Sequence, residues 1–174
     1  AAVDAVAAVL RAEHGRILPA LIRRLGCFDL AEEALQEAAC RALERWPHDG
    51  VPSRPAAWLT LVARRHAIDR VRRGRRWLHD DAALEALAAE AEETEEAAEH
   101  SIGDERLRLL FTCCHPALAA PAQLALALRT LCGLTTREIA RALLEPEATT
   151  AQRLVRARRK ILQARIPYEV PDGE

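Results

Sequence analysis

Residues 133–160 read GLTTREIARALLEPEATTAQRLVRARRK, and this stretch decides the fold. Thr135, followed by Glu138 three positions later, has the form of a capping box at a helix N-terminus. A second helix is predicted at about 149–165, after a turn that contains Pro146. Apolar or small residues recur at helical spacing, at Ile139, Ala140 and Leu143 in the first helix and at Thr150, Leu154, Ala157 and Ile161 in the second. The stretch therefore predicts a short helix packed across a longer one.

That pair of helices has the form of a helix-turn-helix, in which the second helix keeps its N-terminus free for the major groove of DNA. Side chains near that N-terminus read base edges, and basic side chains further along bind phosphates. We expect bases to be faced by Thr149, Ala151, Gln152 and Arg153, and phosphates to be contacted by Arg156, Arg159 and Lys160. The alternative from the residues alone is an ordinary helical hairpin with a basic, solvated face.

The formal net charge of −1 over 174 residues hides three charged blocks. Residues 64–76 hold seven Arg against one Asp, a net of +6, and residues 151–165 hold six basic residues and no acidic one, also a net of +6. Residues 80–105 hold eleven acidic residues and no Lys or Arg. One such block is typical of a solvated face or a linker, whereas two basic blocks in helical units favour nucleic-acid binding. The opposite charges also predict that the acidic segment folds back over a basic face in the free protein, which added salt should then expand.

The composition predicts an all-α protein. Half of the residues are hydrophobic, but only six are aromatic (three Trp, two Phe and one Tyr) and only seven are Gly. Ala, the strongest helix former, is abundant, and runs of β-branched residues are absent. Trp46 and Trp58 lie on apolar stripes and are expected in the core, whereas Trp77 is expected either against DNA or at the domain edge.

The composition also bears on location. No apolar run reaches the about 18 residues that a membrane span needs, and no signal-peptide segment is visible. Five cysteines, an odd number, fit a reducing compartment better than a disulfide scaffold. We therefore expect a cytoplasmic protein without membrane contact.

Breaks in the helical pattern divide the chain into two helical domains. The predicted boundaries are 1–77 and 104–168 for the domains, 78–103 for an acidic linker and 169–174 for a tail. Further helices are predicted at about 3–25, 29–46, 54–73, 104–115 and 121–132. Pro19 predicts a kink or a break near Leu18. Asp29 with Glu32 predicts a capped start for the second helix, and the arginines of 54–73 are expected to face outward.

The helix predicted at 29–46 carries an ordered polar face. Its members, aligned and of mixed sign, are Glu33, Gln36, Glu37, Arg41 and Glu44. Such a face is typical of a surface that docks to another protein. The simpler alternative is an ordinary solvated helix surface.

Cys113, Cys114 and His115, with Cys132, raise the question of a metal or nucleophile site. Adjacent cysteines rarely chelate one tetrahedral ion, and no pair of cysteines has the spacing of a zinc site. A Cys–His nucleophile needs an exposed pair that a third group orients, and nothing marks one. We therefore expect buried cysteines that pack as small apolar residues, with no metal, no cofactor and no catalytic residue.

Three motifs, in order along the chain, resemble those of one protein family. Residues 30–38, LAEEALQEA, resemble the core-binding region of extracytoplasmic-function sigma factors, the small two-domain bacterial initiation factors. Residues 55–73, PAAWLTLVARRHAIDRVRR, resemble their −10 recognition helix, and residues 133–160 resemble their helix-turn-helix for the −35 element. The similarity covers nearly the whole chain and includes a linker of the right kind.

The resemblance implies a nucleoid-associated promoter-specificity subunit of bacterial RNA polymerase. The implied core-binding residues, which would contact the β′ clamp helices, are Glu33, Gln36, Glu37, Arg41 and Glu44. The implied −10 DNA contacts are Asp49, Ser53, Arg54, Arg64, Arg65, His66, Arg70 and Arg73, with loop 47–54 accepting a flipped base. The implied −35 contacts are Thr135, Arg137, Thr149, Ala151, Gln152, Arg153, Arg156, Arg159 and Lys160. The resemblance further implies the β flap as a partner and places the acidic linker in the channel that later carries RNA.

Some positions depart from the family pattern. They are Glu33, where Asp is common, Arg65, where Asn is common, and Leu144 and Ala148, where Gly is common in the turn. Residues 111–118, FTCCHPAL, resemble a subgroup with a long helical C-terminal extension that this chain does not contain, so the chain is expected to be a truncated or processed piece. Control by that extension or by an anti-sigma factor is left open.

Two other classes of protein stay open on the residues alone. A stand-alone DNA-binding regulator would need the helix-turn-helix but not the face from Glu33 to Glu44. A helical interaction protein, whose basic faces only provide solubility, would bind DNA negligibly at any salt concentration.

Overall fold

The computed structural model describes residues 2–74, 105–166 and 168, and all regular structure within these ranges is helical. The helices are α1 (Ala2–Leu25), α2 (Phe28–Asp49), α3 (Pro55–Gly74), α6 (Glu105–Cys113), α7 (Ala120–Thr130), α8 (Thr136–Ala142) and α9 (Glu147–Gln163). The all-α class is confirmed. The linker, Trp77 and the tail lie outside the described residues. None of the described helices is long and apolar enough to cross a membrane.

Helices α1, α2 and α3 pack against one another around an apolar core. The buried side of α2 repeats every three or four residues, at Phe28, Ala31, Ala34, Leu35, Ala38, Ala42 and Trp46. Its many alanines have small side chains, which let the neighbouring helices approach closely. The Trp46 ring meets the half-buried Trp58 ring of α3 edge to face, with 5.6 Å between ring centroids. Both tryptophans therefore lie at the core, as predicted.

Two prolines lie inside helices instead of ending them. A kink or a break was predicted near Leu18, and because α1 continues through Pro19 to Leu25, the helix does not break there. The loss of one backbone hydrogen bond at Pro19 is offset by the complete burial of its neighbours Ile17 and Leu18. Pro47 lies in the last turn of α2, and that helix ends at Gly50, whose φ of 82° is left-handed.

The predicted capping box at the start of α2 is wrong. The helix begins after Cys27, which makes no side-chain cap, and Asp29 and Glu32 lie within the first turns of the helix. Their carboxylates pair instead with arginines of distant helices. Ion pairs to distant helices therefore use the two carboxylates that the local sequence pattern predicted for a cap.

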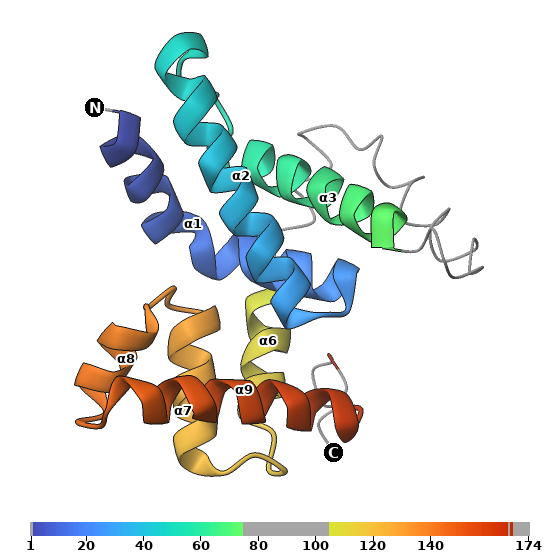
Figure 1. Cartoon of the computed structure of the whole chain (residues 1–174), viewed down its shortest axis with the longest axis vertical. Coiled ribbons are helices and arrows are strands. Elements are labelled where there is room, and N and C mark those ends of the chain that lie inside the picture. The colour runs from blue at the N-terminus through green and yellow to red at the C-terminus, as the bar shows by residue number, and fades with distance from the viewer. Residues whose placement is uncertain (1, 75–104, 167, 169–174) are drawn as a thin grey trace.

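The C-terminal helices form a second, smaller cluster. The predicted inner residues of α9, namely Thr150, Leu154, Ala157 and Ile161, are all buried. α9 begins at Glu147, two residues earlier than predicted, because Pro146 serves as its N-cap residue. The two clusters touch, since α1 packs against α6 and α7. Figure 1 shows the N-terminal helices on one side of the molecule and α7–α9 on the other, with α6 between them.

Candidate nucleic-acid and polymerase interfaces

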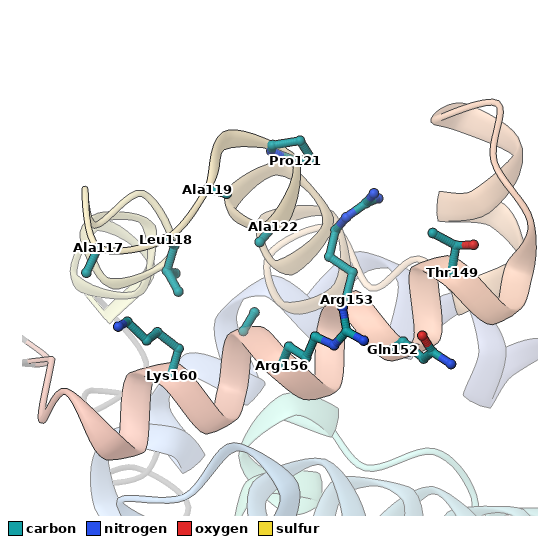
Figure 2. Close-up of a pocket in the computed structure, with 11 residues that line it drawn as sticks. Ala117, Leu118, Ala119, Pro121, Ala122, Thr149, Gln152, Arg153, Arg156 and Lys160 are labelled. Carbon is teal, nitrogen blue, oxygen red and sulfur yellow. The ribbon is translucent and has the colours of Figure 1, made fainter.

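Exposed polar side chains gather along one side of α9. Gln152, Arg156 and Lys160 follow one another at intervals of four residues and therefore lie on one face. Together with Thr149 they border a groove of about 350 Å³ (Figure 2). The second wall of this groove is the apolar segment 117–122, which was not predicted to belong to the site because it carries no charged or polar side chain. The other predicted −35 residues Thr135, Arg137, Ala151 and Arg159 are exposed.

Arg153 differs from its neighbours on α9 because it is already paired within the helix-turn-helix. Its guanidinium pairs with the carboxylate of Glu145, which also accepts a hydrogen bond from the Thr150 hydroxyl at 2.5 Å. The hydrogen bond from Arg153, and after it that from Thr150, lowers the pKa of Glu145. In the free protein the ion pair between Arg153 and Glu145 therefore connects α9 to the turn that precedes it. The sequence did not predict this role.

The capping box at the start of α8 is confirmed. The Thr135 hydroxyl oxygen accepts a hydrogen bond from the backbone N–H of Glu138 at 3.2 Å, and the Glu138 carboxylate accepts one from the backbone N–H of Thr135 at 2.8 Å. The backbone hydrogen bond from Thr135, followed by that from its hydroxyl, lowers the pKa of Glu138. This cap fixes the first turn of α8, the helix that packs against α9.

The polar face of α2 is assembled as the sequence predicted. Gln36, Arg41 and Glu44 are exposed, and Glu33 and Glu37 are half-buried. Arg41 Nε donates a hydrogen bond to Glu37 at 3.3 Å, and the guanidinium of Arg70 on α3 pairs with Glu33. The face is therefore a set of opposite charges held partly by intramolecular pairing.

Residues predicted to bind the −10 element lie along α3 and the loop before it. Asp49, Ser53, Arg54, Arg65, Arg70 and Arg73 are exposed, and His66 is half-buried. Arg64 is only 3% exposed, so the expectation that the arginines of this helix face outward is wrong there. The reason is its spacing, since Arg64 lies four residues after the fully buried Thr60 and one turn before Ile68, on the side of α3 that meets the core.

The cysteines divide between the core and the surface. Cys113 is buried, with Sγ 3.5 Å from the Thr130 hydroxyl, and burial raises the pKa of its thiol to about 12. A thiol that stays protonated is a poor nucleophile. Cys114 and Cys132 are exposed, so the expectation of buried cysteines is wrong for both. Within the described ranges no cluster of three His, Cys, Asp or Glu side chains is placed to hold a metal ion.

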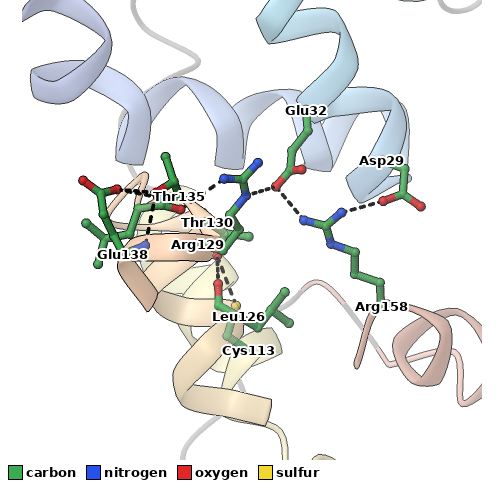
Figure 3. A network of polar contacts seen from close by, with 10 residues as sticks. Asp29, Glu32, Cys113, Leu126, Arg129, Thr130, Thr135, Glu138 and Arg158 are labelled. Atoms are coloured by element: carbon green, nitrogen blue, oxygen red, sulfur yellow. Dashed lines mark hydrogen bonds and ion pairs between the residues drawn. The ribbon is translucent and has the colours of Figure 1, made fainter. Parts of the chain in front are cut away.

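Charged residues from both ends of the chain meet in a network that sequence reasoning missed. Arg158 of α9 and Arg129 of α7 converge on Glu32 of α2, and Arg158 also reaches Asp29 (Figure 3). In the sequence, Arg158 is one of six basic residues in the block 151–165. A single sequence does not reveal which arginine of such a block is turned inward. The network connects the cluster of α1–α3 to the cluster of α6–α9.

The same two clusters correspond to known protein regions. Residues 9–77 match the family model of Sigma-70 region 2, and residues 108–161 match that of Sigma-70, region 4. The chain is also 48% identical over 161 residues to an uncharacterized protein of Rhizobium meliloti (strain 1021), a match that covers 88% of this chain and 37% of the relative. No solved structure matches the chain. Region 2 followed by region 4 is the two-domain architecture of the extracytoplasmic-function type, and the chain therefore belongs to the sigma-70 family.

Proposed function

We propose that this chain acts as a promoter-specificity subunit of bacterial RNA polymerase. It would bind the core enzyme, read −35 and −10 elements and help to separate the DNA strands at the start region. One observation carries the proposal. A single chain holds regions 2 and 4 of the sigma-70 family in order, each with an exposed basic face, together with an exposed face of mixed charge on α2.

The α2 face is proposed to dock on the β′ clamp helices. Gln36, Arg41 and Glu44 are the exposed members, and Glu33 and Glu37 lie beside them. Mixed charges on one face favour a partner of complementary pattern and discriminate against others. The pairing of Glu33 with Arg70 joins this face to α3, so core binding and −10 recognition would be adjacent on the protein.

The groove side of α9 is proposed to enter the major groove of the −35 element. Thr149, Ala151 and Gln152 lie near the N-terminus of α9, which is the part of a recognition helix that reads bases. Arg156, Arg159 and Lys160 lie further along the helix and would bind phosphates. Thr135 and Arg137 at the start of α8 would contact the DNA backbone. Arg153 would have to exchange Glu145 for a base or a phosphate.

The exposed residues of α3 and of the loop before it are proposed to bind the −10 element. Arg65, Arg70 and Arg73 would follow the backbone of the melted strand, with His66 beside them. Asp49, Ser53 and Arg54 would line the place where a base is flipped out and read. Arg64 would act through packing, because it has little exposed surface.

The remaining partners follow from the proposed function. Region 4 would also contact the β flap, and an anti-sigma factor or a C-terminal extension would control the chain. Because its partners act on the genome, the chain would work in the cytoplasm of a bacterium.

Binding to purified bacterial core polymerase tests the proposal. The Gln36→Ala/Glu37→Ala variant should bind at least about tenfold more weakly than the wild type, a loss of about 1.4 kcal/mol, since a few central residues carry most of the binding energy of an interface. The Glu147→Ala/Gln163→Ala variant makes the same two changes at exposed positions of α9 and should bind core like the wild type. Salt-sensitive DNA binding without any core binding would contradict the proposal and favour a stand-alone regulator.

A further inference from the structure

A cavity of about 340 Å³ lies where α1 and α2 meet the segment that joins α7 to α8. Its walls come from Leu10, Arg11 and His14 of α1, from one side of residues 32–39 of α2, and from residues 129–135. The volume falls in the lower part of the range that is typical of small-molecule sites. The cavity is separate from the groove beside α9, because the two share no lining residue.

The inner wall of the cavity is apolar. Leu35 is 4% exposed, and the partly buried Leu10 and Ala39 pack against the same core. The Ala39 side chain is a single methyl group, which leaves space in the cavity that a larger residue at this position of α2 would fill. The wall can therefore cover the apolar part of a small ligand.

The imidazole of His14 adds a flat, uncharged surface to this wall. Burial, followed by the charge of Arg129, lowers the pKa of His14 against smaller raising effects of Glu32 and of a hydrogen bond with the Thr130 backbone. The ring is therefore neutral near pH 7. Gly133 lies directly against it, since a Cβ atom at Gly133 would be 2.9 Å from the Cγ atom of His14.

The charged groups around the cavity leave one cation without a partner. Glu32 accepts hydrogen bonds from Arg129 at 3.2 Å and from Arg158 at 2.6 Å, so two guanidinium groups already share its charge (Figure 3). Arg11 is exposed, and no carboxylate within the described ranges pairs with it.

One unpaired guanidinium favours a ligand with a single negative charge. The planar fork of an arginine matches the two oxygens of a carboxylate. A phosphate monoester carries nearly two charges near pH 7, and the lining has no second unpaired cation within the described residues to balance them. The cavity therefore fits a carboxylate better than a phosphate.

We propose that this cavity is a binding site for a small carboxylate with an apolar body. Arg11 binds the carboxylate at the rim, and Leu10, Leu35 and Ala39 cover the apolar body. The ligand also covers Gln36, which lines the same cavity and belongs to the α2 face. It thereby competes directly with core polymerase for that face, and this second part rests on the proposed function.

A pair of matched probes tests the carboxylate preference on the full chain. 2-Naphthoate and 2-naphthamide have the same aromatic body, but only the first is charged. Isothermal titration calorimetry should show binding of 2-naphthoate about tenfold tighter than that of 2-naphthamide, because a hydrogen-bonded charge pair contributes at least that much. Equal binding of the two probes, or no binding of either at millimolar concentration, would overturn the site.

Two arginine variants assign this preference to a residue. Arg11→Ala should bind 2-naphthoate and 2-naphthamide equally. Arg141→Ala, which removes an exposed arginine of α8 outside the cavity, should keep the preference of the wild type. A preference that survives in Arg11→Ala would contradict the role of Arg11.

Ala39→Leu tests the cavity without changing a charge. The larger side chain occupies the space of the ligand, and leucine is a good helix former, so the helicity by circular dichroism should stay the same. The variant should lose 2-naphthoate binding. Unchanged affinity in Ala39→Leu would place the probe elsewhere on the protein and overturn the assignment.

The cysteines report where the probe binds. Cys132 is exposed and lines the cavity, whereas the exposed Cys40 and Cys114 do not line it. Saturating 2-naphthoate should slow the alkylation of Cys132 by iodoacetamide severalfold, measured by mass spectrometry, and leave the rates of Cys40 and Cys114 unchanged. Equal effects on the three thiols would contradict binding in the cavity.

Competition with core polymerase separates this site from the proposed function. 2-Naphthoate should weaken the binding of the wild type to core and have no effect on the binding of Ala39→Leu. A probe that protects Cys132 but leaves core binding unchanged would overturn the competition. If the chain does not bind core at all, the proposed function fails, whereas calorimetry and alkylation still decide whether the cavity binds a carboxylate.

Discussion

Leu144 has a backbone conformation that suits glycine. Its φ is 53°, in the left-handed region, and its side chain is 94% exposed. A side chain that packs against nothing does not compensate for this conformation, which costs about 1–2 kcal/mol for a residue with a Cβ. The turn between α8 and α9 therefore imposes its geometry on Leu144, and glycine is the residue commonly found there in the resembling sigma factors.

Leu144→Gly should stabilise region 4. The relief of backbone strain exceeds the extra chain entropy of glycine, about 0.5–1 kcal/mol, so the net gain should be a few tenths to about 1 kcal/mol. Urea unfolding checks this as a higher midpoint with an unchanged slope. A lower midpoint would show that the turn does not hold the backbone in the left-handed region.

The capping box makes the stability of region 4 depend on pH. The pKa of Glu138 is lowered by hydrogen bonds that only the folded state provides. A lowered folded pKa means that the stabilisation is fully present above the unfolded pKa and is lost as the pH falls through the folded value. Glu138→Gln keeps an acceptor but does not titrate. The melting temperature of the wild type relative to Glu138→Gln should therefore be constant above about pH 5 and fall in more acidic solution. A difference that does not change with pH would contradict the ionised cap.

The basic side of α9 can be tested through its phosphate contacts. Each lysine or arginine that neutralises a phosphate contributes about 0.9 to the slope of log affinity against log salt concentration. Arg156→Ala should lower that slope by about one for DNA of any sequence, measured by fluorescence anisotropy. Arg141→Ala, on the exposed side of α8, should leave the slope unchanged. Equal slopes for Arg156→Ala and the wild type would remove Arg156 from the proposed DNA face.

The helices of region 4 were more predictable than the ends of α2. In α8 the cap uses neighbours in sequence, so Thr135 and Glu138 could be read directly from the pattern. In α2 the same kind of pattern failed, because Asp29 and Glu32 bind arginines more than ninety residues away. The buried side of α9 followed from helical periodicity, whereas the second wall of its groove is apolar and gives no signal in sequence.

For the protein as a whole, the arrangement of the two domains was the part that the sequence did not predict. Charge blocks suggested attraction between the acidic linker and a basic face, but the contact within the described residues uses single residues such as Glu32 and Arg158. A Cβ atom at Gly15 would lie 2.2 Å from the carbonyl oxygen of Leu131. The sequence did not predict this close approach of α1 to Leu131, because no sequence pattern distinguishes such a glycine from others inside helices. Such contacts depend on side-chain packing between domains, which periodicity along one chain does not encode.

Acidification should loosen the contact between the domains. His14 of α1 faces Gly133, and its pKa is lowered first by burial and then by Arg129, against smaller raising effects of Glu32 and the Thr130 backbone. A lowered histidine pKa means that the closed state binds fewer protons, so its stability is fully present above about pH 6.5 and is lost as the pH falls below that value. The radius of gyration should therefore rise between pH 7.5 and pH 5.5 in the wild type and change less in His14→Gln. The same pH response in both proteins would exclude His14 as its cause.

The most direct test of the central claim is transcription by purified core polymerase from genomic DNA fragments, with the 5′ ends of the transcripts sequenced. Adding this chain should create new start sites that share one −35 and one −10 element at constant spacing. The Gln36→Ala/Glu37→Ala variant should produce few of these sites. Identical start sites with and without the chain would contradict the proposal that it gives the polymerase its promoter specificity.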